Sequence, residues 1–134
     1  MSLAPGSTIG IVGGGQLGRM LAIAAAQIGY RSHIFDPHYA PCAAEVASKF
    51  TRAPFTDEAA LRAFGEACDV VTYEFENLPV APLAVLGDKL RPGTRSLEIA
   101  QDRAVEKNFI EGAGAIIAPW REIDGVDDVR AALA

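Results

Sequence analysis

The chain has 134 residues, a length typical of one domain rather than two, and half of them are hydrophobic, enough for a buried core. Twelve basic and 17 acidic side chains give a net charge of −5, which argues against a nucleic-acid-binding or membrane-surface protein. The two cysteines, Cys42 and Cys68, form no CxxC pair or metal-ligand pattern, so a reducing cytoplasm is favoured over a disulfide scaffold or a structural zinc site. No apolar stretch is long enough to span a bilayer.

Strand-like and helix-like segments alternate along the chain. Short apolar, β-branched runs predict strands over 8–12, 32–35, 49–51 and 69–73, with a further strand starting at 116–117. Helical spacing and stop signals predict helices over 16–28, 57–67, 79–86, 97–110 and 126–133. We expect Thr56 to cap the second helix. The alternation is typical of an α/β fold, a doubly wound parallel sheet with helices on both faces.

A Pro-Gly break at residues 91–94 divides the chain into an expected first unit, 1–95, and a second, 96–134. A helix pattern is still running at Ala134, which predicts a fragment of a longer protein.

A glycine-rich motif lies between the first strand and the first helix. Gly13, Gly15 and Gly18 have the spacing G-x-G-x-x-G, which is typical of a tight turn that admits a ligand to the backbone. The following helix N-terminus would offer free N–H groups to an anion. The alternative is a packing turn that binds nothing.

Asp36 ends the second predicted strand, eighteen residues after Gly18. A carboxylate at this place binds the ribose hydroxyls in dinucleotide-binding domains, so the first 36 residues favour an NAD site. The alternative is that Asp36 and Pro37 only terminate a strand.

A polar segment follows the strongest strand. Glu74, Glu76 and Asn77 come directly after Tyr73, and ligands of open α/β sheets bind beyond the carboxyl ends of the strands. If the strand continued, alternation would place both glutamates on the side of the glycine-rich loop, where a carboxylate accepts hydrogen bonds from ribose or amine groups. The alternative is a solvated loop that turns at Asn77 before a proline.

Other candidates are more ordinary. Arg103 and Lys107 share a helix face that is typical of a solvated charged surface. His33 is expected to be a strand residue and His38 a loop residue, because neither has a nucleophile partner. No cluster with metal-ligand spacing is visible, and Trp120 is expected to pack.

Together the motifs resemble one family. Residues 9–21, residues 72–79, Gln101–Arg103 with Lys107, and Ala118–Trp120 are similar to successive motifs of the 5-(carboxyamino)imidazole ribonucleotide synthases. These are ATP-grasp ligases of de novo purine biosynthesis, and their first domain is a Rossmann-like pre-ATP-grasp domain.

The resemblance implies an ATP-dependent carbon–nitrogen ligase. ATP and bicarbonate would form carboxyphosphate with the help of Mg²⁺, and the amine of aminoimidazole ribonucleotide would take the carboxyl group. Residues 1–95 would bind the ribonucleotide, and residues 96–134 would be a linker helix and the start of a truncated ATP-grasp region. A cytoplasmic location and a homodimer are also suggested.

The resemblance also implies site residues. Gly14, Gly15, Gln16 and Leu17 would cradle the ribonucleotide, and Glu76, with Asn77 beside it, would accept hydrogen bonds from the ribose. Arg103 would reach the ATP phosphates, with Lys107 nearby.

The resemblance places catalytic residues and metal ligands outside this chain, so we expect it to be inactive alone. Residues after about Asn108 are expected to be poorly packed or exchanged with a neighbouring molecule.

Two other functions fit part of the sequence. An NAD(P)-binding domain of an oxidoreductase would explain Asp36, and a non-catalytic nucleotide-binding module would explain the glycine-rich loop.

Overall fold

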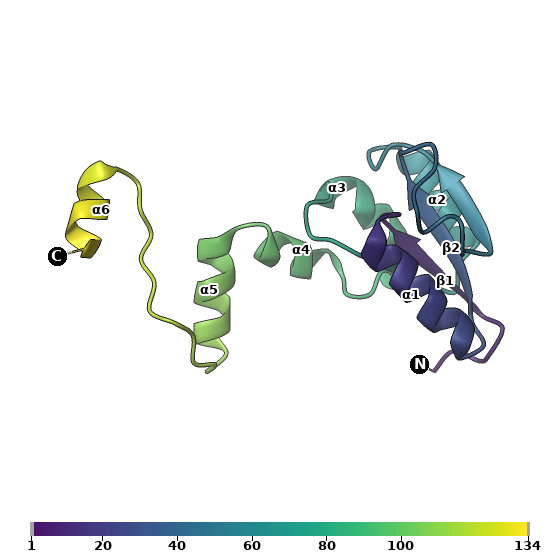
Figure 1. Cartoon of the computed structure of the whole chain (residues 1–134), viewed down its shortest axis with the longest axis horizontal. Helices are drawn as coiled ribbons and strands as arrows, with labels where there is room; N and C mark the ends of the chain where they lie inside the picture. The colour runs from purple at the N-terminus through teal and green to yellow at the C-terminus, as the bar shows by residue number, and fades with distance from the viewer. Residues whose placement is uncertain (1, 134) are drawn as a thin grey trace. The chain divides into compact units, whose positions relative to one another are not determined.

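The computed structural model describes residues 2–133 and contains one parallel four-stranded sheet (Figure 1). The strands are β1 (Thr8–Val12), β2 (Arg31–Asp36), β3 (Lys49–Arg52) and β4 (Val70–Tyr73), in the order β3-β2-β1-β4. This confirms the α/β fold with a doubly wound parallel sheet.

Helices follow β1, β3 and β4, whereas β2 leads to β3 through a loop with no helix between them. The helices are α1 (Gln16–Gln27), α2 (Glu58–Glu66), α3 (Val80–Leu83), the 3₁₀ helix η1 (Ala84–Lys89), α4 (Thr94–Ala100), α5 (Arg103–Gly112) and α6 (Val126–Leu133). Within the described residues, none of these helices has the length and apolar character needed to cross a membrane.

Alternating strand residues divide the core into two clusters, one on each face of the sheet. On one face, Ile11 and Ile34 pack with Ala22 of α1, which lies along β1 and β2. On the other face, the strands pack against α2, α3 and η1; this cluster contains Val12, Phe35, Leu61, Phe64, Cys68, Val71, Leu78, Leu83, Leu86, Leu90 and Leu97. Both faces are therefore covered, as a parallel sheet requires.

The register brings the carboxyl ends of three strands to one level. Val12 at the end of β1 pairs with Phe35 of β2 and with Tyr73 of β4. The chain order reverses between β1 and β4, and ligands of such sheets bind at this switch point. The glycine-rich loop, Asp36 and Glu74 all lie at this edge.

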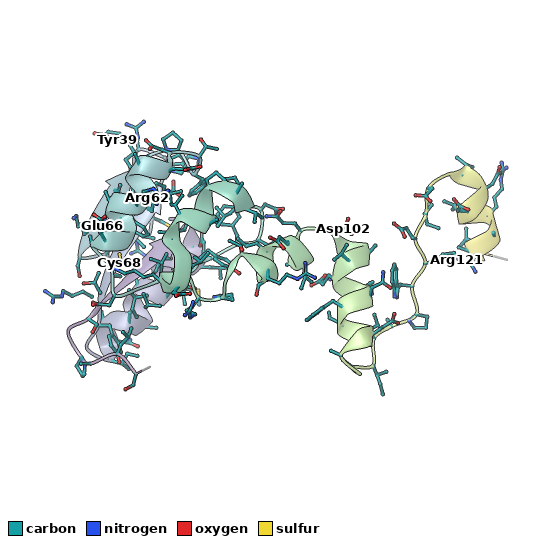
Figure 2. The ribbon with its side chains drawn as sticks, turned by 180° about the vertical axis from the view of Figure 1, so that it is seen from behind. Tyr39, Arg62, Glu66, Cys68, Asp102 and Arg121 are labelled. Atoms are coloured by element: carbon teal, nitrogen blue, oxygen red, sulfur yellow. The ribbon has the colours of Figure 1, made fainter. Side chains whose placement is uncertain are left out.

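Three local predictions are wrong. Asp57, not Thr56, caps α2, since its carboxylate accepts a hydrogen bond from the backbone N–H of Ala60 at 2.9 Å. The helix expected over 97–110 is two helices, because Asp102 accepts from the N–H groups of Ala104 and Val105 and starts α5 anew (Figure 2). The strand expected at 116–117 does not form; the segment 115–123 is irregular, and no described strand pairs with it.

The chain divides into two compact units, one ending at Glu98 and one beginning at Ile99. The expected boundary after residue 95 lies a few residues earlier, inside α4, and it stays a prediction of domain organisation. Among the described residues of α5 and α6, none is buried. This exposure agrees with the poor packing expected after Asn108, whereas exchange with a neighbouring molecule stays a prediction.

Candidate functional site

The loop between β1 and α1 is held by carboxylates from the two neighbouring strands. Gly13 turns the chain with a φ of 104° and donates its N–H to the carbonyl of Phe35 at 2.9 Å. The N–H of Gly14 donates to Asp36 Oδ2 at 2.7 Å. The N–H groups of Gly15 and Gly18 donate to Glu74 Oε1 at 2.8 Å and Oε2 at 2.5 Å. The first turn of α1 is therefore not the fully open anion site that the glycine motif predicts.

Asp36 has a loop-holding role. Its carboxylate is buried, and its Oδ1 accepts hydrogen bonds from the backbone N–H of His38 at 2.8 Å and lies 2.7 Å from the Nδ1 of the same residue. Both carboxylate oxygens thus have partners within the chain. The ribose-binding role that the NAD hypothesis assigns to Asp36 has no support from this geometry, and the turn-forming alternative fits it.

An open hollow of about 460 Å³ lies against the loop at the carboxyl edge of the sheet. Its lining consists of Gly14, Gly15, Asp36, His38, Ala40, Pro41, Cys42, Phe55, Glu74 and Phe75. Polar groups from the loop and strand ends line one part of it. The rings of Phe55 and Phe75, whose centroids are 6.0 Å apart, supply an apolar part. A flat ring with polar substituents suits such a lining.

Gln16 and Leu17 begin α1 and are exposed. As the first two helical residues, they have N–H groups without an intrahelical acceptor, and no hydrogen bond from either N–H to the described chain is present. Of the predicted binding residues, Gly14 and Gly15 line the hollow directly. The side chains of Gln16 and Leu17 are not in its lining.

Glu74 and Glu76 do not share one environment, contrary to the expectation. The strand ends at Tyr73, so the alternation that would place both on one side is lost. Glu74 turns to the glycine-rich loop, whereas Glu76 and Asn77 are exposed, with Asn77 Nδ2 3.4 Å from Glu76 Oε1. Neither Glu76 nor Asn77 lines the hollow.

Several lining residues were not singled out as binding residues in the sequence. His38 and Cys42 belong to the loop after β2, Phe55 to the loop after β3, and Phe75 to the loop after β4. His38, Cys42 and Phe55 belong to no motif, whereas Phe75 lies within the motif of residues 72–79 but was not given a binding role. The general rule that ligands bind beyond the carboxyl ends of parallel strands would have pointed to these loops.

His33 and Cys68 lie outside the site, in the core beside Phe64. Burial, together with the charge of Lys49, lowers the pKa of His33 to about 4, and its Nε2 is 2.8 Å from Thr51 Oγ1. Burial also raises the pKa of Cys68 to about 11. Both groups are thus neutral packing residues near pH 7, and His33 is the strand residue that the sequence predicts.

Arg103 and Lys107 lie on α5 in the second unit. Arg103 forms an ion pair with Glu106, and the ammonium of Lys107 lies 5.9 Å from the centre of the Trp120 ring. Among residues 2–133, no three His, Cys, Asp or Glu side chains converge in a way that could hold a metal ion.

The chain matches a known protein family over most of its length. Residues 6–101 match the model of the ribonucleotide synthetase preATP-grasp domain. The N5-carboxyaminoimidazole ribonucleotide synthase of Brucella melitensis is 48% identical over 134 residues, 98% of this chain and 37% of that protein.

Solved structures give the same similarity. N5-carboxyaminoimidazole synthetase from Staphylococcus aureus, complexed with ADP, is 38% identical with a TM-score of 0.84, over 98% of this chain and 36% of that one. N5-carboxyaminoimidazole ribonucleotide synthetase from Thermus thermophilus is 43% identical with a TM-score of 0.80, over 93% and 35%. The chain thus spans little more than a third of the length of these relatives. Because the family model covers most of its residues, the chain belongs to the ribonucleotide synthetase pre-ATP-grasp domain family.

Proposed function

We propose that this chain is the ribonucleotide-binding part of an ATP-dependent ligase that carboxylates 5-aminoimidazole ribonucleotide with bicarbonate. The observation that supports this function most strongly is the hollow at the switch point between β1 and β4, in a chain that belongs to the pre-ATP-grasp family. The names of the relatives favour this function over a nicotinamide-dependent oxidoreductase or a non-catalytic nucleotide-binding module. The unpaired cysteines, Cys42 and Cys68, are compatible with the cytoplasm as its location.

The proposed binding residues have separate tasks. The backbone of Gly14 and Gly15 forms part of the wall against which the ligand lies, since both glycines line the hollow. The N–H groups of Gln16 and Leu17 point along the start of α1 and suit a single phosphate group. Glu76 and Asn77 do not line the hollow themselves, but they directly follow Phe75, which does, and from there Glu76 would accept hydrogen bonds from the ribose hydroxyls, with Asn77 beside it.

ATP is the proposed second substrate. A relative's structure contains ADP, and Arg103 and Lys107 are the residues of this chain that would face its phosphates. Breaking the ion pair with Glu106 would free the Arg103 guanidinium for a phosphate. Residues 2–133 offer no carboxylate cluster that fits Mg²⁺, so we assign the metal to none of them, and we assign no catalytic residue to this chain. Bicarbonate and a homodimer belong to the same proposal.

Ribonucleotide binding is tested by titrating the ¹⁵N-labelled chain with 5-aminoimidazole ribonucleotide. We expect saturable shifts of the amide signals of Gly14, Gly15, Gln16 and Leu17. Glu76→Gln should weaken binding by about tenfold, because charge-assisted hydrogen bonds to the ribose are lost. Glu66→Gln, an equal change at an exposed position of α2, is the matched control and should leave the affinity unchanged. Saturation without shifts in the loop, or equal effects of the two variants, would contradict the proposed site.

ATP binding is tested with two matched arginine variants, one at Arg103 and one at Arg130. Arg103 and Arg130 each form an ion pair with an acidic residue three positions away in their own helix. We expect Arg103→Met to weaken ATP binding and Arg130→Met to have no effect. With ATP, bicarbonate and the ribonucleotide together, the 134-residue chain should release no ADP, and turnover would show that catalytic residues lie within it.

A further inference from the structure

We propose that Glu74 determines the ligand specificity of the glycine-rich loop, because its carboxylate occupies the place of a dinucleotide's diphosphate. In dinucleotide-binding domains the loop N–H groups and the N-terminus of the following helix bind this diphosphate. Here two of these N–H groups, those of Gly15 and Gly18, bind a carboxylate of the chain itself. The glycine fingerprint therefore serves an internal anion, and dinucleotides are excluded.

The contacts of Glu74 are those of a bound anion. Its two oxygens accept from the N–H groups of Gly15 at 2.8 Å and of Gly18 at 2.5 Å, so one carboxylate bridges the loop and the first turn of α1. The N-terminal residue of α1 is preceded by Gly15, which has no side chain to cap the helix. Glu74, 56 to 59 residues away in sequence, supplies that negative charge.

The glycines leave space that Glu74 fills. A Cβ atom added to Gly13 would overlap the Cγ of Glu74, and one added to Gly15 would lie 2.7 Å from Glu74 Oε1. In a dinucleotide-binding loop the second glycine admits the diphosphate. In this chain the corresponding Gly15 admits the glutamate side chain. The volume is occupied, so a diphosphate cannot approach the backbone while Glu74 stays in place.

Charge adds to this exclusion. The carboxylate of Asp36 also contacts the loop, through the N–H of Gly14, so two carboxylates converge on its backbone. A diphosphate brought to the loop would meet both negative charges at short range, in a partly buried setting where screening is weak. Volume and charge together therefore favour ligands that do not place a diphosphate on Gly15 and Gly18.

The inference goes beyond the proposed function and does not require it. It concerns the N–H groups of Gly15 and Gly18, which Glu74 occupies, whereas the ribonucleotide proposal uses the hollow and the N–H groups of Gln16 and Leu17, which Glu74 does not contact. The probes are therefore NADH and inorganic pyrophosphate, not the ribonucleotide.

The experiment compares the wild-type chain with Glu74→Ala, which empties the space, and Glu74→Gln, which keeps the volume and removes the charge. Glu66→Ala is the matched control. It also removes one carboxylate, but at an exposed position of α2, labelled in Figure 2, that is distant in sequence from the loop. NADH and pyrophosphate are titrated while the amide signals of Gly15 and Gly18 are followed by NMR. Circular dichroism reports whether each variant is folded.

We expect no shift of these two signals in the wild type or Glu66→Ala, and a smaller gain of binding in Glu74→Gln than in Glu74→Ala, because the amide keeps most of the volume but removes the charge and leaves one acceptor oxygen. In Glu74→Ala we expect both signals to shift, with affinity for pyrophosphate raised by about tenfold or more over the wild type. Binding of either probe at Gly15 and Gly18 in the wild type would overturn the proposal, as would a folded Glu74→Ala that gains nothing. If Glu74→Ala does not fold, Glu74→Gln decides the matter, because it should bind pyrophosphate more tightly than the wild type, and a folded Glu74→Gln without any gain would overturn the proposal.

Discussion

Gly18→Ala tests how closely α1 must approach β1. Gly18 is buried in the first turn of the helix, where alanine would normally stabilise by about 1 kcal/mol. The added Cβ, however, would lie 2.6 Å from the carbonyl oxygen of Gly13, closer than real Cβ atoms come to backbone oxygen. Since a backbone oxygen cannot rotate away, the helix or the loop must shift.

The size of the effect follows from what that shift disturbs. Overpacking costs about 1–3 kcal/mol. Moving the first turn also weakens the hydrogen bond from the Gly18 N–H to Glu74, which is worth about 1.5–3 kcal/mol because its acceptor is charged. After subtracting the gain in helix propensity, we expect the free energy of unfolding to fall by about 2–4 kcal/mol.

Urea denaturation followed by circular dichroism measures this change. Gly112→Ala is the matched control, because Gly112 is also helical but has no atom within 4 Å of the added Cβ. It should leave the urea transition unchanged, because α5 belongs to the second unit and contributes no buried residue to the core. If Gly18→Ala unfolds at the same or a higher urea concentration than the wild type, with an unchanged m-value, the close approach does not constrain the fold.

Three further predictions concern stability and reactivity. Asp57→Ala should destabilise the chain by about 1 kcal/mol in urea denaturation by removing the cap of α2, whereas Thr56→Ala should be close to neutral; the reverse order would refute the assignment of the cap. The pKa of His33 is lowered from 6.5 to about 4 by burial, so below pH 6.5 the unfolded chain binds the proton and the native one does not. The contribution of His33 to the free energy of unfolding is therefore fully present above pH 6.5 and is lost as the pH falls toward 4. Between about pH 7 and about pH 5, the free energy of unfolding should fall more for the wild type than for His33→Gln. Because burial raises the pKa of Cys68 to about 11, iodoacetamide at about pH 8 should label the half-buried Cys42 in the native chain and spare Cys68, which mass spectrometry of peptides checks.

Local signals were enough to predict most of the fold. The β-branched run at residues 8–12 and the glycines after it predicted β1, the loop and α1, because turn, strand and helix chemistry agree there. The split between α4 and α5 was missed, since Asp102 sits within a continuous helical pattern and ends it through a cap. Whether a helix continues through such an aspartate or starts again after it depends on a few hydrogen bonds. The spacing of apolar residues along the sequence does not reveal these bonds.

The candidate site was predictable in place but not in detail. The glycine spacing and the rule for parallel sheets located the carboxyl edge of β1. Which carboxylate faces the loop depends on where β4 ends, and a strand that stops at Tyr73 sends Glu74 to the loop and leaves Glu76 exposed. The Glu74 contacts join residues more than fifty positions apart, so no local pattern contains them.

Both hydrophobic clusters end in sequence at or before Leu97, and α5 and α6 contribute no buried residue to either. The heat absorbed on melting should therefore come from the first 98 residues rather than from the whole chain. A heat-capacity change of about 1.2–1.5 kcal/mol/K is expected for a unit of this size. Amide hydrogen exchange should show the same division, with slow exchange in β1, β2 and β4 and exchange near the random-coil rate beyond α4.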